Sequence, residues 1–302
     1  GIDLLFIEWN VSPTLFSIGD FEVRWYGLFF AISFFLGYQI IQKMFKMEGE
    51  NLKKLDKLLI FVLIATIVGA RLGHVFFYDW EDYKDDLWRI FNIREGGLAS
   101  HGAAITIILS LIIFSRIFYK EKKMLWIFDR VALTIALAAF FIRMGNLFNH
   151  EIMGTITDVP WAFKFSHWTD QLPRHPAQLY EALTYLVMFG VLWWMYFKKK
   201  LYTRSGLIFG VFFTWLFVSR FFIEFVKEHQ AQGVADDSFL NMGQYLSIPC
   251  ALIGIFFIFY GLKHKVEDPV AAHQARLAAE GGESTKAEDS DDSNKSSKDE
   301  ES

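Results

Sequence analysis

Long apolar stretches separated by short polar connections dominate the first 265 residues of the chain. Seven of these stretches approach the roughly 20 residues that an α-helix needs to cross a bilayer. They cover approximately residues 23–45, 55–77, 97–119, 125–148, 178–197, 205–226 and 243–262. The pattern therefore predicts an all-α polytopic membrane protein with seven transmembrane helices.

The pattern changes on both sides of these stretches. Residues 1–22 are too mixed to cross a membrane, and Phe6, Ile7 and Trp9 indicate an interfacial segment at the outer face. Residues 23–265 are expected to form one seven-helix transmembrane domain. Residues 266–302 are rich in Ser, Lys, Asp and Glu and have too few apolar side chains to build a core. They predict a disordered acidic cytoplasmic tail.

Lysine and arginine gather in alternate connections, which sets the orientation of a membrane protein. The basic residues of the first, third and fifth connections are Lys43, Lys46, Lys53, Lys54, Lys57, Arg116, Lys120, Lys122, Lys123, Arg130, Lys198, Lys199, Lys200 and Arg204. The second connection is acidic, with Asp79, Glu81, Asp82, Asp85 and Asp86. The odd connections are therefore predicted to be cytoplasmic, with the N-terminus outside and the C-terminus inside.

Composition agrees with a membrane class, since 53% of the residues are hydrophobic and 33 of them are Phe. The formal net charge of −4 arises largely from the tail and one loop, and no nucleic-acid partner is expected. A single cysteine, Cys250, excludes an intrachain disulfide and a cysteine zinc cluster. No metal or cofactor is expected. The first apolar stretch is too long for a cleavable signal peptide.

Charged and amide side chains occur where two of the apolar stretches should still lie in the membrane. The fourth stretch ends in Arg143-Met-Gly-Asn146-Leu-Phe-Asn149-His-Glu151-Ile-Met-Gly154, and Arg220 and Glu224 lie within the sixth. Ionisable groups at membrane depth are costly and by default indicate function. These positions are therefore the first candidates for a site.

Counting along each predicted helix, at about 1.5 Å of rise per residue, places the polar residues in one layer near the outer leaflet. The layer comprises Tyr26, Arg71, His74, His101, Arg143, Asn146, Asn149, Glu151, Gln178, Tyr180, Glu181, Arg220, Glu224 and Gln244. Guanidinium groups match phosphate oxygens bidentately, and apolar walls below suit acyl chains. The layer predicts an enzyme or carrier that works on an anionic, lipid-like molecule.

Several of these residues also have a purely structural interpretation. Arg71 can extend to the interface from a helix end, and Arg220 with Glu224 can be a structural ion pair. His74 is most simply structural. His101, which follows Gly96-Gly97 and precedes Gly102, stands between a structural and a chemical role.

Several sequence blocks together resemble bacterial prolipoprotein diacylglyceryl transferases. The family signature Arg-x-Gly-Asn-Phe-hydrophobic-Asn-x-Glu-x3-Gly corresponds to residues 143–154, with Leu147 where Phe is usual. Ile142 replaces a common glycine, and His101-Gly102-Ala103 replaces a His-Gly-Gly turn. The other blocks are Arg24-Trp25-Tyr26-Gly27, Gly69-Ala-Arg71-Leu-Gly73, Gly96-Gly97-Leu-Ala-Ser-His101-Gly102, His175-Pro-Ala-Gln178-Leu-Tyr180-Glu181, Arg220-Phe-Phe-Ile-Glu224 and Met242-Gly-Gln244.

The resemblance implies an enzyme of the bacterial cytoplasmic (inner) membrane with its active site toward the outer leaflet. Such an enzyme moves the diacylglyceryl group of phosphatidylglycerol to the lipobox cysteine of a preprolipoprotein signal peptide. A thioether forms and glycerol 1-phosphate leaves.

The resemblance also implies roles for individual residues, and no metal. Arg143 and Arg220 would bind the phosphate, and His101 would be the base or position the thiol. Tyr26 would be catalytic with them. The remaining phosphatidylglycerol contacts would be Asn146, Asn149, Glu151, Gly154, Glu224 and Arg71.

Two other classes stay open at this point. A secondary transporter of an anionic solute would need polar residues at the midplane, accessible from both sides in turn, whereas these crowd one face. A non-catalytic receptor for lipid or signal peptide would use the same pocket. Because both expected substrates are amphiphiles, lateral entry between helices is expected in either lipid-binding case.

Overall fold

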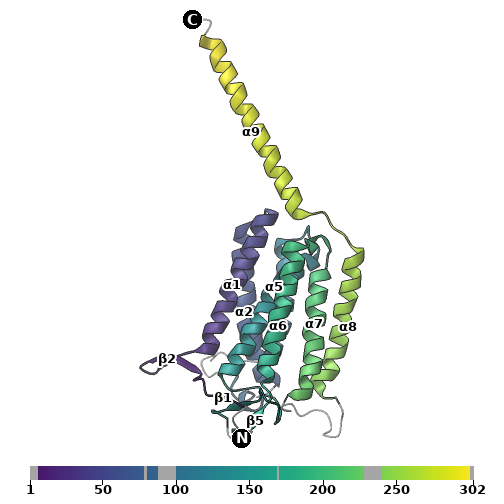
Figure 1. Cartoon of the computed structure of the whole chain (residues 1–302). Coiled ribbons are helices and arrows are strands. Elements are labelled where there is room, and N and C mark those ends of the chain that lie inside the picture. The colour runs from purple at the N-terminus through teal and green to yellow at the C-terminus, as the bar shows by residue number, and fades with distance from the viewer. Residues whose placement is uncertain (1–5, 78–79, 88–99, 169, 228–239, 300–302) are drawn as a thin grey trace.

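The computed structural model describes residues 6–77, 80–87, 100–168, 170–227 and 240–299. They form a bundle of long helices that run back and forth, with a few short strands at one end and a projecting helix at the other (Figure 1). The helices of the bundle are α1 (Trp25–Glu48), α2 (Leu52–Phe77), α4 (Ser100–Phe118), α5 (Met124–Phe148), α6 (Ala177–Trp193), α7 (Leu207–Ile223) and α8 (Met242–Lys263). A single helical turn, α3 (Trp80–Tyr83), follows α2.

Six of these helices are long and apolar enough to cross a membrane. They are α1, α2, α5, α6 with its π-helical extension Trp194–Lys198, α7 with the 3₁₀ turn Glu224–Val226, and α8. The predicted stretch 97–119 corresponds to α4, whose apolar part Ala103–Phe118 is shorter. The protein is thus mostly helical as expected, and the count supported by helix length is six crossings.

Helix α5 is the centre of the bundle and packs against α1, α6 and α7. The largest apolar core joins residues such as Met44, Leu133, Tyr185 and Ile208, all fully buried or nearly so. The outward faces remain apolar, for example at Ile64 of α2, as expected where helices meet lipid tails.

Helices α7 and α8 approach each other through small residues. A Cβ atom added at Gly254 would lie 2.3 Å from the Thr214 hydroxyl oxygen, and one at Gly210 would lie 2.6 Å from the Ile258 nitrogen. Gly261 makes a similar approach to Leu207. Close backbone approach of this kind replaces the hydrophobic effect as a source of helix association in lipid.

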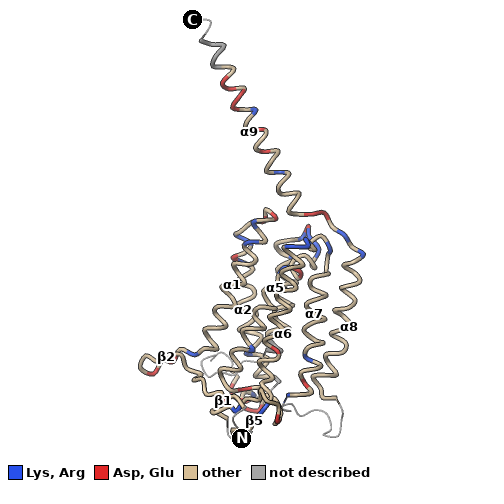
Figure 2. The backbone as a smooth tube through the Cα atoms, viewed as in Figure 1, with Lys and Arg blue, Asp and Glu red and all other residues tan. Residues whose placement is uncertain are grey.

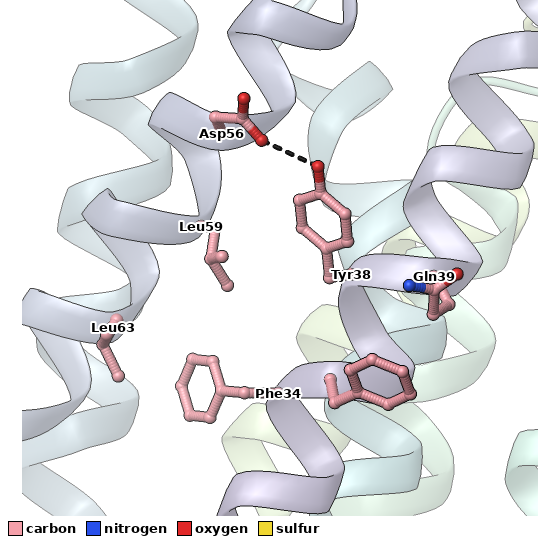
Figure 3. Close-up of a pocket in the computed structure, with 7 residues that line it drawn as sticks. Phe34, Tyr38, Gln39, Asp56, Leu59 and Leu63 are labelled. Atoms are coloured by element: carbon pink, nitrogen blue, oxygen red, sulfur yellow. Dashed lines mark hydrogen bonds between the residues drawn. The ribbon is translucent and has the colours of Figure 1, made fainter.

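Helices α1 and α2 make few contacts with each other, which leaves a groove of about 460 Å³ between them. Figure 3 shows its walls of Phe34, Leu59 and Leu63, and its polar rim, where Tyr38 donates a 2.7 Å hydrogen bond to Asp56.

Short strands at one end of the bundle were not anticipated by the all-α prediction. β1 (Ile7–Trp9) pairs in parallel with β4 (Phe163–Phe165), which pairs antiparallel with β5 (Pro173–Arg174). β2 (Thr14–Ile18) and β3 (Phe21–Arg24) form a hairpin that leads into α1. Runs of two to five residues are too short for periodicity to show. The interfacial role of residues 1–22 stays a prediction.

In the C-terminal segment, α9 (Pro269–Asp299) is one exposed helix that projects from the bundle (Figure 1), and the disordered cytoplasmic tail stays a prediction. The Asp268 carboxylate accepts hydrogen bonds from the Val270 and Ala271 amides at 3.0 Å and so caps its first turn. Residues 270–279 include five Ala together with one Gln, one Arg and one Leu, all of which favour helix. The ring of His273 packs on Gly49, the left-handed cap of α1.

A buried ion pair ties three helices together at the same end as α9. Glu48 of α1 accepts hydrogen bonds from Arg130 of α5 at 2.5 and 2.9 Å, and also from the Tyr196 hydroxyl. The Glu48 and Arg130 side chains are at most 1% exposed. Beside them, the buried Asp129 carboxylate accepts from the Gly206 and Phe209 amides at the start of α7, where the helix dipole favours negative charge.

Replacing Glu48 with Gln should lower the free energy of unfolding by about 3–5 kcal/mol, because Arg130 then stays buried without its counter-charge. Denaturant unfolding in detergent micelles measures the change. Glu81→Gln is the matched control, since the Glu81 side chain is 81% exposed in its pair with Lys84, and its unfolding midpoint should equal the wild type. Equal midpoints for both variants would contradict the structural importance of the buried pair.

Candidate functional site

Charged residues lie at the two ends of the bundle, and the helices between them are almost free of charge (Figure 2). The candidate site is at the end that carries the strands, opposite α9 (Figure 1). It is built from the start of α1, the end of α5, the start of α6, the end of α7 and the start of α8. Residues from five helices therefore meet there, whereas the layer predicted from the sequence also included residues of α2 and α4.

The last turn of α5 and the chain reversal after it hold Arg143 in a network of amides. Arg143 donates from Nη1 to the Asn146 side-chain oxygen at 2.9 Å. The side-chain amides of Asn146 and Asn149 both donate to Glu151 Oε1, at 3.0 and 3.2 Å. His150 adopts φ 53°, a left-handed conformation that is uncommon for non-glycine residues. The reversal turns Glu151 back beneath the end of the helix.

Glu181 of α6 is the centre of the site. Its carboxylate lies 2.6 Å from Arg143 Nε through Oε2 and 3.0 Å from Lys227 Nζ through Oε1. The Tyr185 hydroxyl donates to Oε2 at 3.1 Å. The Glu181 side chain is only 1% exposed, and those of Arg143 and Lys227 are 12% and 11% exposed. A buried carboxylate therefore joins α5, α6 and the segment that follows α7.

Arg220 of α7 lies near the same carboxylate. The Arg220 guanidinium is half-buried and lies within electrostatic range of Glu181 and Tyr185. It makes no direct ion pair with Glu224 within the described residues, so the alternative of a structural Arg220–Glu224 pair is wrong. Arg143 is thus paired with Glu181, and Arg220 of a separate helix lies within electrostatic range of the same anion.

Glu224 instead connects the end of α7 to the start of α8. Its Oε1 lies 3.6 Å from Lys227 Nζ, and its Oε2 accepts from the Asn241 side-chain amide at 2.9 Å. Asn241 also forms a capping box with Gln244 at the start of α8. Glu224 therefore positions Lys227 and the α8 terminus. Neither Lys227 nor Asn241 was among the predicted site residues.

Tyr26 at the start of α1 closes one side of the network. Its ring packs on the backbone of Gly145, where an added Cβ would lie 2.6 Å from Tyr26 Cδ2. The Tyr26 hydroxyl lies within electrostatic range of Glu151 and Arg143. The adjacent Arg24 donates to the Asn149 side-chain oxygen at 3.5 Å. The structure therefore brings Tyr26 close to the network that holds Arg143.

Gly154 lies where three chain segments cross. Its amide donates to the His175 carbonyl at 2.8 Å, and the next amide, that of Thr155, donates to the Val226 carbonyl at 2.8 Å. An added Cβ would lie 2.5 Å from both the His175 Cβ and the Val226 oxygen. Because Val226 precedes Lys227, these backbone contacts place Lys227 next to Glu181.

His175 belongs to the wall of the site. Burial lowers the pKa of His175, and its Nδ1 lies 2.9 Å from the Tyr180 hydroxyl. Gln178, one turn further along, donates to the Glu151 carbonyl at 3.1 Å. This block therefore links α6 to the reversal after α5.

Two predicted site residues are not joined to this network by the described contacts. Arg71 is buried in α2, where its Nη2 donates to the Tyr83 hydroxyl at 2.9 Å. His101 is the second residue of α4, and its side chain lies outside the described part of the chain. Its role as base stays a prediction. Within the described residues, no group of His, Cys, Asp and Glu is arranged to hold a metal ion.

Comparison with known proteins gives consistent matches over most of the chain. Residues 13–260 match the family model of prolipoprotein diacylglyceryl transferase. The phosphatidylglycerol–prolipoprotein diacylglyceryl transferase of Tolumonas auensis is 44% identical over 257 residues, which are 85% of this chain and 98% of that protein. Its counterpart in Chloroherpeton thalassium is 42% identical over 258 residues, 85% of this chain and 95% of that protein. Its counterpart in Bacteroides fragilis is 40% identical over 282 residues, 87% of this chain and 99% of that protein.

Gly154→Ala should destabilise the site end of the protein, because the new methyl group would push apart the chain segments that cross at Gly154 and position Lys227. The expected effect is a loss of about 1–3 kcal/mol in the free energy of unfolding, measured by denaturant titration in micelles.

Gly190→Ala is the matched control, since an added Cβ there meets nothing within 4 Å. Alanine in place of this mid-helix glycine should stabilise slightly. If Gly154→Ala were as stable as Gly190→Ala, the crossing would not be tight.

Proposed function

Since the chain belongs to the prolipoprotein diacylglyceryl transferase family, and is therefore a membrane-bound transferase, we propose how its site carries out the transfer. Phosphatidylglycerol is the diacylglyceryl donor and a prolipoprotein is the acceptor, as in the names of its relatives. Arg143 and Arg220 bind the phosphate of the donor. The acceptor atom is the thiol of a lipobox cysteine in the signal peptide.

The observation that carries this assignment is that Arg143 pairs with Glu181 and that Arg220 lies within electrostatic range of the same carboxylate. The end of the bundle is built around a negative charge, and arginine forks are suited to a phosphate placed next to it. An arginine offers several N–H donors. The described residues use two donors of Arg143 and leave the rest of its guanidinium for a substrate anion.

The reaction displaces a phosphate from a glycerol carbon. A thiolate sulfur attacks the carbon that carries the phosphate, the C–O bond breaks, and the electron pair stays on the phosphate oxygen of glycerol 1-phosphate. Guanidinium groups that face this oxygen stabilise its growing charge. A free thiol has a pKa of about 8.5, so a base helps without having to be strong. His101 at the start of α4 is the proposed base.

The remaining side chains hold the headgroup and the arginines. Asn146, Asn149 and Glu151 form the network that orients Arg143, and Tyr26 closes it. Gly154 contributes through the close chain crossing at its backbone, and Glu224 contributes by positioning Lys227. Arg71 is proposed as a further contact to the donor headgroup from α2.

We further propose that α4 is a seventh crossing, with the N-terminus outside, the C-terminus in the cytoplasm and the site at the outer leaflet of the inner membrane. Basic residues gather at the end of the bundle that carries α9 (Figure 2), and such residues favour the cytoplasmic side. The Arg143 end is then the outer one.

Openings between helices support lateral entry from the bilayer. Besides the groove between α1 and α2, a second groove of about 300 Å³ lies between α6 and α7. Thr184, Trp215 and Ser219 line it, and Ser219 directly precedes Arg220. Acyl chains can reach the phosphate site along this wall without passing through water. A transporter is disfavoured because the site network lies at one end of the bundle.

Arg143→Ala and Arg220→Ala should each lower the rate of thioether formation by about 10²–10³-fold, because one stabilising partner of the leaving phosphate is lost. Arg143→Lys should rescue poorly, since an ammonium is a point charge without the planar fork. The assay follows phosphatidylglycerol consumption and peptide lipidation with a lipobox peptide in proteoliposomes.

Arg204→Ala is the matched control, because Arg204 lies at the α9 end and donates to the Leu262 carbonyl. Wild-type rates for Arg143→Ala would remove the phosphate assignment. Peptide or lipid binding without consumption by the wild type would identify a receptor instead of an enzyme.

Cysteine labelling in intact and permeabilised cells checks the proposed orientation. In a Cys250→Ser background, Glu81→Cys should react with a membrane-impermeant maleimide in intact cells, whereas Lys199→Cys should react only after permeabilisation. The opposite labelling pattern would place the site at the cytoplasmic face.

A further inference from the structure

We propose that Lys227 is a third phosphate-binding cation and a catalytic residue, held by Glu181 and Glu224 until the leaving phosphate develops its second negative charge. This inference rests on the proposed function, because it concerns the same phosphate as Arg143 and Arg220.

The position of Lys227 is fixed by backbone contacts on two sides. It pairs with Gly154 in an isolated antiparallel bridge, and the preceding carbonyl, that of Val226, accepts from the Thr155 amide at 2.8 Å. Its side chain is 11% exposed and reaches two carboxylates. The ammonium group is therefore brought into the site by the fold and does not extend into solvent.

The two carboxylates hold Lys227 with different strength. Nζ lies 3.0 Å from Glu181 Oε1 and 3.6 Å from Glu224 Oε1, whereas Arg143 lies 2.6 Å from the other oxygen of Glu181. Glu181 can therefore keep Arg143 in place if Lys227 turns away. A lysine has a flexible stem and three donors that rotate freely, which suits a cation that changes partner.

The cations of the site share their carboxylates. Glu181 is divided between Arg143 and Lys227, and Glu224 is divided between Lys227 and the Asn241 side-chain amide. Arg220 lies within electrostatic range of Glu181. A phosphodiester, which carries a single negative charge, is an anion that these cations can bind when the donor enters.

The chemical step then raises the demand for positive charge. The sulfur–carbon bond forms, the carbon–oxygen bond breaks, and the thiol proton passes to the base. The phosphate, a singly charged diester before the step, becomes a monoester that gains a second negative charge. A cation that moves to this oxygen binds the transition state more strongly than the ground state, and only such a difference raises kcat.

The test measures kcat and KM for phosphatidylglycerol with a lipobox peptide in proteoliposomes. Lys227→Met and Lys227→Gln should each lower kcat by about 10²–10³-fold and change KM by less than about threefold. Lys227→Arg, which keeps the charge, should retain at least about a tenth of kcat. Thermal unfolding of each purified variant shows that the loss does not come from a failure to fold.

Lys164→Met is the matched control, because Lys164 lies on β4 at the same end of the bundle and should leave kcat unchanged. A rise in KM at constant kcat for both neutral variants, or unchanged values, would overturn the role of Lys227. If Arg143→Ala and Arg220→Ala also kept full activity, the proposed function itself would fail. If they lost activity while Lys227→Met did not, only this inference would fail.

Discussion

The carboxylate of Glu181 is the interaction on which the site end of the bundle depends. It is buried and lies between Arg143 and Lys227, with Arg220 of α7 within electrostatic range. Cations gathered this closely at membrane depth would repel one another and lose their hydration without a fixed anion between them. Glu181 therefore makes it possible to assemble several positive charges in an apolar bundle. That assembly is what a phosphate-displacing enzyme requires.

The two ends of the bundle solve the cost of buried charge in different ways. At the α9 end, Arg130 and Glu48 form a closed pair whose side chains are at most 1% exposed, and Tyr196 satisfies the same carboxylate. At the site end, Glu181 is shared by two cations, Arg143 and Lys227, and the described contacts leave part of the Arg143 guanidinium without a protein acceptor. The first arrangement joins α1, α5 and α6. The second is the one for which we propose a substrate anion.

The helices and the polar layer were predictable because both depend on periodic or local signals. Apolar length located the helices, and depth counting placed Arg143 and Arg220 at the same end. Lys227 was not predicted as a site residue because it follows the apolar stretch, where a lysine is typical of a connection between helices. Its role follows from the crossing at Gly154, a contact between segments about 70 residues apart in sequence that no local pattern shows.

A structure of the protein with phosphatidylglycerol bound tests the central claim most directly. The account predicts that the phosphate contacts the guanidinium groups of both Arg143 and Arg220, with Glu181 still bound to Arg143. A phosphate that contacts only one of these arginines, or that lies at the α9 end of the bundle, would contradict it.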